Sequence, residues 1–248
     1  MGRFLIVLLA FIALFIASLS AYALPLNNHT ALELAYSYKI LMFPALYVYW
    51  LFPGALILLA YWVFAQWQKR HTASALTLTQ AILFAISSIV FIVWINLWHY
   101  EQFILALAAL AVISICLFIL YLTYPLTENK MNGRLPISIA FAAIAFLTFL
   151  TIGFLFISNN LIDFGLSRQL WAVVLLTCAA ALALAIRFHL YDAAFPAVFI
   201  WFLIGVAIAN TFNELLVTTA ALFLSGVLIV GIIFIRKRLP SNANKKRL

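Results

Sequence analysis

Charged side chains are scarce in this sequence, and their scarcity excludes most classes of soluble protein. Asp, Glu, Lys and Arg make up 8% of the 248 residues, whereas 68% are hydrophobic and the mean hydropathy is +1.19. A soluble domain typically carries about 25% charged residues. A chain with so little charge could not keep its apolar surface away from water, so the composition predicts a membrane protein.

Cysteines and catalytic motifs are scarce as well. Cys116 and Cys178 both fall within long apolar runs, so we expect neither a disulfide framework nor a cysteine-based metal site. The sequence contains no Gly-rich phosphate loop, zinc-binding signature or Gly-x-Ser-x-Gly nucleophile motif. We therefore assign no metal ligand and no catalytic residue, and an enzyme is the less favoured class.

Long apolar runs are abundant instead. A run of about 18 or more apolar residues can cross a hydrocarbon core roughly 30 Å thick as a helix. The sequence therefore predicts an all-α, polytopic transmembrane bundle of about 8 helices, with spans at residues 4–24, 40–66, 76–98, 103–123, 136–158, 168–187, 193–210 and 214–235.

The first run allows two interpretations. Its length suits a retained membrane helix, whereas Arg3 before the apolar core and the Ala21-Tyr22-Ala23 ending suit a cleaved secretory signal. Cleavage would leave about 7 helices and would not change the orientation of the others.

The basic residues predict the orientation. With both termini in the cytoplasm, twelve of the 14 Lys and Arg residues lie inside, and only Lys39 and Arg168 lie outside. This asymmetry follows the positive-inside rule. We therefore attribute the net charge of +8 to the orientation of the protein in the membrane, and we expect no nucleic-acid partner. Residues 236–248 are predicted to form a basic cytoplasmic tail.

Aromatic and polar side chains gather where the third span ends, in the stretch FIVWINLWHYEQF at residues 91–103. In the third span, Gln80, Phe84, Ser87, Phe91, Trp94 and Trp98 share one helical face, which we expect to look into the bundle because polar side chains avoid lipid. The second span presents further aromatic side chains at helical spacing. Candidate ligand-binding residues are Tyr47, Trp50, Trp94, Asn96, Trp98, His99 and Glu101.

A second polar group, Arg187, His189 and Asp192, lies in the loop after the sixth span. We interpret it as a solvated cytoplasmic cluster in which Arg187 and Asp192 are partners.

Three stretches carry a resemblance to a known family. FPALYVYWLFPGALILLAYWVF looks like a second helix with a proline before an aromatic run, INLWHYEQF like the end of a third, and GRLPISIAFAAIAF like the start of a fifth. In their order and spacing they resemble the TspO/translocator-protein family, the tryptophan-rich sensory proteins, and specifically its longer bacterial relatives.

The resemblance implies a five-helix core over residues 1–155 and three additional transmembrane helices over residues 156–235. It also implies a location in the bacterial plasma membrane and an aromatic cavity for a hydrophobic planar ligand such as a sterol, a porphyrin or a haem. Aromatic faces on uncharged helices suit such a ligand.

The sequence is compatible with three hypotheses for the function. The leading hypothesis is an integral membrane receptor or carrier for a hydrophobic ligand, with the lipid bilayer and that small molecule as partners. The second is an intramembrane enzyme that uses His99 and Glu101 as an acid–base pair on a lipid or porphyrin. The third is a structural membrane subunit without a ligand, and a homo-oligomer is compatible with each.

Overall fold

The computed structural model describes residues 1–27, 29–38, 40–72, 75–125, 130–158 and 165–235. Within these ranges the chain is helical and contains no named strand. The elements are α1 (Gly2–Ala23), α2 (Ala31–Ser37), the 3-10 helix η1 (Leu46–Trp50), α3 (Leu51–Lys69), α4 (Leu78–His99), α5 (Phe103–Leu122), α6 (Arg134–Ser158), α7 (Arg168–Leu190), α8 (Ala194–Asn210) and α9 (Leu215–Phe234). The predicted basic tail at residues 236–248 lies outside the described residues.

The helices confirm the predicted all-α transmembrane class. Among the described residues, seven spans are long and apolar enough to cross a membrane, namely α1, η1 with α3, α4, α5, α6, α7 and α9. The remaining predicted span is α8, which has 17 residues and a length of about 25 Å at 1.5 Å per residue. Ten of its residues are buried, because it packs between α6, α7, α9 and η1.

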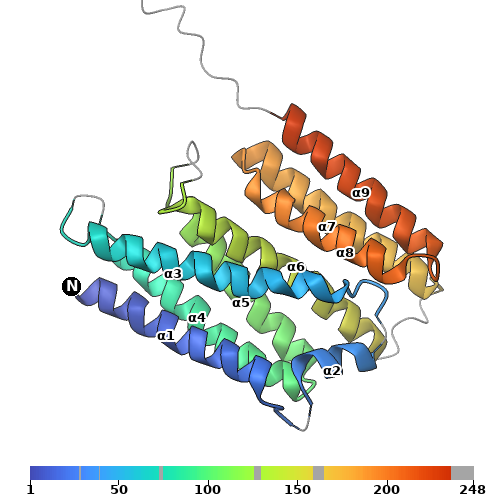
Figure 1. Cartoon of the computed structure of the whole chain (residues 1–248), viewed down its shortest axis with the longest axis horizontal. Helices are drawn as coiled ribbons and strands as arrows, with labels where there is room; N and C mark the ends of the chain where they lie inside the picture. The colour runs from blue at the N-terminus through green and yellow to red at the C-terminus, as the bar shows by residue number, and fades with distance from the viewer. Residues whose placement is uncertain (28, 39, 73–74, 126–129, 159–164, 236–248) are drawn as a thin grey trace, which may run out of the picture.

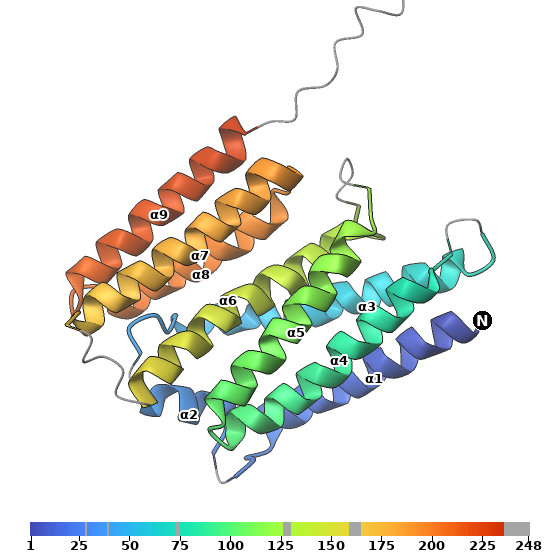
Figure 2. The same ribbon diagram turned by 180° about the vertical axis from the view of Figure 1, so that it is seen from behind.

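The helices form two groups on either side of α6 (Figures 1 and 2). In the first group, α1 packs along α4, α5 packs against both α4 and α6, and α3 lies against α6 and α1. In the second group, α7, α8 and α9 pack together, and α8 and α7 contact α6. The expected boundary at residue 155 lies inside α6, and the division into a five-helix core and three added helices stays a prediction.

The second span differs from the prediction at its start, which is not helical. It was expected to be one helix over residues 40–66, but residues 40–45 are not helical and α3 begins only at Leu51. Pro53 is the third residue of α3, a position where the missing N–H costs α3 no hydrogen bond of its own. The segment before η1 is held instead by α8, since Ala45 N donates to the Gly205 carbonyl at 3.0 Å.

Gly205 allows α8 to approach this segment closely. A Cβ atom placed there would lie 2.2 Å from Val48 Cγ2 and 3.0 Å from Pro44 Cβ. Val48 is fully buried and β-branched, so its side chain has few alternative rotamers. A larger residue at position 205 must therefore push η1 away from α8.

We expect Gly205→Ala to lower the free energy of unfolding by about 1–3 kcal/mol, the usual cost of overpacking a well-packed core. Thermal unfolding of the purified protein in mild detergent measures the change. Gly226→Ala on α9 is the matched control, because nothing lies within 4 Å of its added methyl group. Equal stability of the two variants would contradict this view of the contact between α8 and η1.

The group around Asp192 is not the solvated cluster that was predicted. Asp192 is completely buried and its partner is Arg134, whose Nη2 lies 3.8 Å from Asp192 Oδ2. The same oxygen accepts hydrogen bonds from the Tyr121 hydroxyl at 2.8 Å and the Ser138 hydroxyl at 2.6 Å. Oδ1 accepts from Ala194 N at 2.8 Å, at the first turn of α8. One carboxylate thus connects α5, α6 and α8.

Arg187, the expected partner of Asp192, has other partners. Its Nη2 donates to the Ile232 carbonyl at 2.7 Å and its Nη1 to the Tyr191 carbonyl at 2.9 Å. The first of these bonds connects α7 to the last turn of α9, where carbonyl groups lack intrahelical donors. His189 is exposed, so of the three residues only this histidine matches the solvated interpretation.

Candidate ligand-binding cavity

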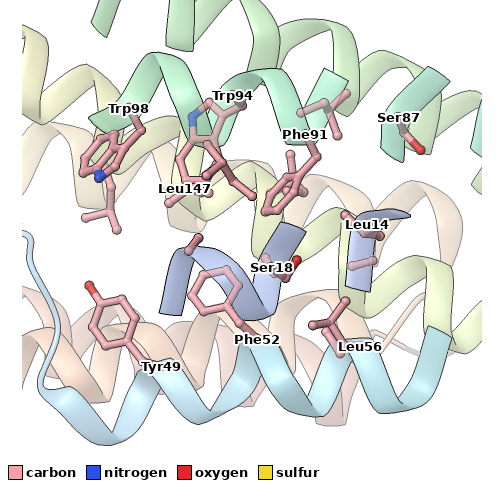
Figure 3. A pocket seen from close by; sticks show the side chains of 18 of the residues that line it. Leu14, Ser18, Tyr49, Phe52, Leu56, Ser87, Phe91, Trp94, Trp98 and Leu147 are labelled. Carbon is pink, nitrogen blue, oxygen red and sulfur yellow. The ribbon is translucent and has the colours of Figure 1, made fainter. Parts of the chain in front are cut away.

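A cavity of about 350 Å³ lies inside the first helix group. This volume is within the usual range of sites for small molecules, about 300–1,000 Å³. Side chains from α1, α3, α4, α5 and α6 form its wall, together with Phe43, Tyr49 of η1 and residues in and next to α2. Figure 3 shows the aromatic residues of α4 on one side of this space and Tyr49, Phe52 and Leu56 on the other.

The α4 wall follows directly from helical periodicity. Residues that recur every three or four positions lie on one face of a helix, and α4 directs Phe84, Ser87, Phe91, Trp94 and Trp98 into the cavity. Trp94 and Trp98 are 8% and 5% exposed. The prediction that this polar and aromatic face looks into the bundle is confirmed.

Aromatic rings from α4, α5 and α6 pack closely at one end of the cavity. The Trp98 ring lies edge-on to Phe154 with centroids 4.5 Å apart, and Trp94 lies 5.8 Å from Trp98. Phe103 completes the group at 5.4 Å from Trp98. Offset and edge-to-face geometries of this kind each contribute about 0.5–1.5 kcal/mol beyond the burial of area. This packing holds the Trp98 ring in place at one end of the cavity.

The wall opposite α4 is made by residues that sequence reasoning missed. Tyr49, Phe52, Leu56 and Leu59 face the cavity, at spacings of three, four and three residues. Their neighbours Tyr47 and Trp50 have the same spacing of three. Nothing in the local pattern distinguishes Tyr49 and Phe52 from Tyr47 and Trp50. The packing of η1 against α8, and of α3 against α6 and α1, decides which pair faces inward.

The predicted residues of the second span therefore lie outside the cavity wall. Trp50 is 76% exposed on the outer surface of the bundle. Tyr47 packs edge-on against Trp201 of α8, with ring centroids 5.0 Å apart. These positions suit contacts with lipid and with α8.

His99 lies in the cavity wall and is 3% exposed. Its Nδ1 is 2.7 Å from the carbonyl oxygen of Ile95, one turn earlier in α4. Its Nε2 is buried and has no hydrogen-bond partner among the described residues. Asn96 points elsewhere, since it is exposed and its Nδ2 donates to the Ile92 carbonyl at 2.9 Å.

Glu101 does not pair with His99. It lies in the turn after α4 with a positive φ of 57°, and its Oε2 accepts a hydrogen bond from the Tyr38 hydroxyl. Burial and the hydrogen bond to Glu101 raise the pKa of Tyr38 to about 12, so the hydroxyl keeps its proton near neutral pH. Because each of the two groups has a separate partner, the geometry gives no support to a His99–Glu101 acid–base pair.

The short helix α2 lies across the end of the cavity next to His99. A capping box begins it, in which Glu33 N donates to Thr30 Oγ1 at 3.3 Å and Thr30 N to Glu33 Oε2 at 2.8 Å. The segment is tied to the α4–α5 turn on both sides, by Asn27 Nδ2 donating to the His99 carbonyl at 3.1 Å and by the Tyr38–Glu101 bond. Figure 1 shows α2 at the ends of α1 and α4.

Of the seven predicted site residues, the structure brings Trp94, Trp98 and His99 together on the cavity wall. Tyr47, Trp50, Asn96 and Glu101 lie outside it. Within the described ranges, no three His, Cys, Asp or Glu side chains are grouped so that they could hold a metal ion.

The chain matches a known protein family. The model of a family described as TSPO-like protein matches residues 4–234, which spans both helix groups. No curated protein and no solved structure matches the chain.

Proposed function

The chain belongs to the TSPO-like family, and from this premise we propose that it is a receptor or carrier for a hydrophobic ligand, such as a sterol-like or porphyrin-like molecule. The long apolar helices and the family identify it as an integral membrane protein. The observation that carries the proposal is the cavity of about 350 Å³ between α1, α3, α4, α5 and α6. We place the protein in the bacterial plasma membrane with both termini in the cytoplasm.

The chemistry of the wall supports an apolar ligand. Among the described lining residues there is no Asp, Glu, Lys or Arg, so the main gain on binding is the removal of apolar surface from water, about 25 cal/mol per Å². A few polar groups among hydrophobic and aromatic side chains are the usual composition of a small-molecule site. Trp94 and Trp98 offer ring faces and edges against which a flat or alicyclic molecule can pack.

We expect Trp98→Ala to weaken the binding of a fluorescent sterol or a porphyrin dimethyl ester by about tenfold, since about 1.4 kcal/mol corresponds to one decade in affinity. The substitution removes one packing surface from the cavity wall. Saturable quenching of tryptophan fluorescence in nanodiscs measures the affinity.

Trp171→Ala is the matched control for this experiment. Trp171 lies on α7 and packs against Phe156 with centroids 4.8 Å apart, away from the cavity, so binding should be unchanged. Equal losses in the two variants, or quenching that never saturates, would indicate partitioning into the bilayer. Either result would remove the basis for a ligand site in this cavity.

A further inference from the structure

One end of the bundle carries basic side chains that have no part in the cavity. α1 begins at this end, α3 finishes there and α4 starts there, and Figures 1 and 2 both show the N-terminus beside the last turns of α3. Arg3, Lys69 and Arg70 lie at these helix ends, and none of them lines the cavity. We call this the basic end, and by the proposed orientation it faces the cytoplasm.

The acidic residues that the structure describes do not neutralise the basic end. Those that are accessible to water lie at the opposite end of the bundle, in α2, after α4 and before α9: Glu33, Glu101 and Glu214. Asp192 is completely buried beside Arg134. Within the described ranges, neither Arg3 nor Arg70 forms an ion pair with a carboxylate. The basic end therefore presents positive charge that requires an anion from outside the chain.

Arg70 is held in one orientation against Trp67. Its guanidinium carbon lies 3.6 Å from the centroid of the Trp67 ring, and its Nη1 donates to the Trp67 carbonyl at 2.8 Å. A guanidinium has five N–H donors, and this is its one hydrogen bond to the described residues. Trp67 is 37% exposed, as is usual for an indole at a membrane–water interface.

Arg3 is brought to the same place by the packing of α1 against α3. Phe4 lies against Trp67 with ring centroids 5.0 Å apart, so α1 and Arg70 both contact the same indole. The Arg3 side chain is exposed, and its Nη1 donates to the Leu76 carbonyl at 3.4 Å. Two guanidiniums from different helices therefore lie near one partly exposed indole ring, at the ends of two membrane helices.

Charge complementarity identifies the partner. The planar fork of a guanidinium matches the oxygens of a phosphate and binds them bidentately. Basic residues at the end of a membrane helix attract anionic lipids, which are present at high concentration in the adjacent leaflet. The outer surface of α1 continues from this site with apolar side chains, since Leu5 and Leu9 are 51% and 65% exposed. The arrangement suits a molecule with a phosphate at one end and acyl chains at the other.

We propose that the basic end binds an anionic phospholipid, with its phosphate held by Arg3 and Arg70 and its acyl chains along the outer surface of α1. The site is separate from the cavity, because Arg3, Trp67 and Arg70 do not line it, so the inference is independent of the proposed function. It also differs from the general preference of basic residues for one side of a membrane, because it assigns the lipid to two particular side chains.

Native mass spectrometry of the full-length protein in mild detergent tests the lipid preference. The probes are phosphatidylglycerol and phosphatidylcholine with identical acyl chains, so the two lipids differ in headgroup and net charge alone. We expect the first phosphatidylglycerol to bind about tenfold more tightly than the first phosphatidylcholine, since each basic side chain near an anionic lipid contributes about 1 kcal/mol.

Substitutions of single charges assign the preference to the two arginines. Arg3→Gln combined with Arg70→Gln should leave phosphatidylglycerol within about twofold of phosphatidylcholine. Lys69→Gln is the matched control at the same end, because the Lys69 Nζ already donates to the Asn132 carbonyl at 3.1 Å, and it should keep the preference. Arg168→Gln, at the opposite end on α7, should keep it as well.

The results that would overturn the inference are specific. Equal affinity of the two lipids for the wild-type protein would do so, as would an unchanged preference in a folded double variant. A loss in Lys69→Gln as large as in Arg70→Gln would show a diffuse effect of charge without a site. Glycerol 3-phosphate should not displace the lipid, and displacement would show a site for a soluble phosphate instead. If the double variant does not fold, Arg3→Gln at its exposed position should still weaken the preference about threefold.

Discussion

An Asp192→Ala variant is expected to lose about 3–5 kcal/mol of its free energy of unfolding, the range measured when one member of a buried ion pair is removed. The substitution removes the carboxylate oxygen that lies 3.8 Å from the Arg134 guanidinium, which is 1% exposed. It also removes the acceptor for the hydroxyls of Tyr121 and Ser138 and for the N–H of Ala194. Unfolding by titration with a denaturing detergent in mixed micelles measures the loss.

Two further variants show whether the buried charge is the cause. Asp192→Ala combined with Arg134→Met removes both charges, and the pair should recover part of the lost stability because no uncompensated charge remains. Glu214→Ala is the control at a partly exposed carboxylate with one long contact, 3.4 Å to Gln169, and should change stability by less than about 0.5 kcal/mol. A loss at Asp192 no larger than this would contradict a buried network.

Filling the cavity should have the largest effect on ligand binding. Ala143 lies in the α6 part of the wall and is 3% exposed, so Ala143→Phe places a ring in the space that the ligand would use. We expect at least a hundredfold loss of affinity for the fluorescent sterol, which is about 2.7 kcal/mol. The same quenching titration in nanodiscs measures it.

Ala108→Phe is the control for this experiment, because it makes the same substitution at an exposed position of α5. It should leave binding unchanged. The unfolding midpoint of each variant without ligand shows whether the ring is accommodated. A folded Ala143→Phe protein that binds as tightly as the wild type would place the ligand outside this cavity.

The helices and one wall of the cavity could be predicted from the sequence. Each membrane span is a local run of apolar residues, and its length alone makes a helix the favourable structure in lipid. The inward face of α4 could be predicted because the polar residues Gln80 and Ser87 share a helical face with Trp94 and Trp98. A polar side chain on a membrane helix favours the interior of the bundle. Phe91 lies on the same face.

The start of the second span could not be predicted from the same signals. Residues 40–45 are as apolar as the segments that form membrane helices. Their backbone groups, however, find partners outside the segment, such as Asn210 Nδ2, which donates to the Leu41 carbonyl at 2.8 Å. That partner lies far away in the sequence. Hydropathy measures how well a segment suits lipid and is insensitive to where its hydrogen bonds go.

The sequence by itself determined the class of the protein and the helices that cross the membrane, because hydropathy and a period of 3.6 residues are properties of a single segment. It also singled out Trp94, Trp98 and His99. Only the tertiary structure decided that Tyr49 and Phe52, rather than Tyr47 and Trp50, face the cavity, because the orientation of η1 and α3 depends on their packing against α8, α6 and α1.

The partner of Asp192 was decided in the same way. A carboxylate in a short loop between helices is solvated unless other helices cover it, and the sequence does not show which residues those helices bring. Arg134, Tyr121 and Ser138 meet it only after α5, α6 and α8 have packed together. Burial and the pairing of charges depend on contacts between distant segments, so they are set when the bundle closes.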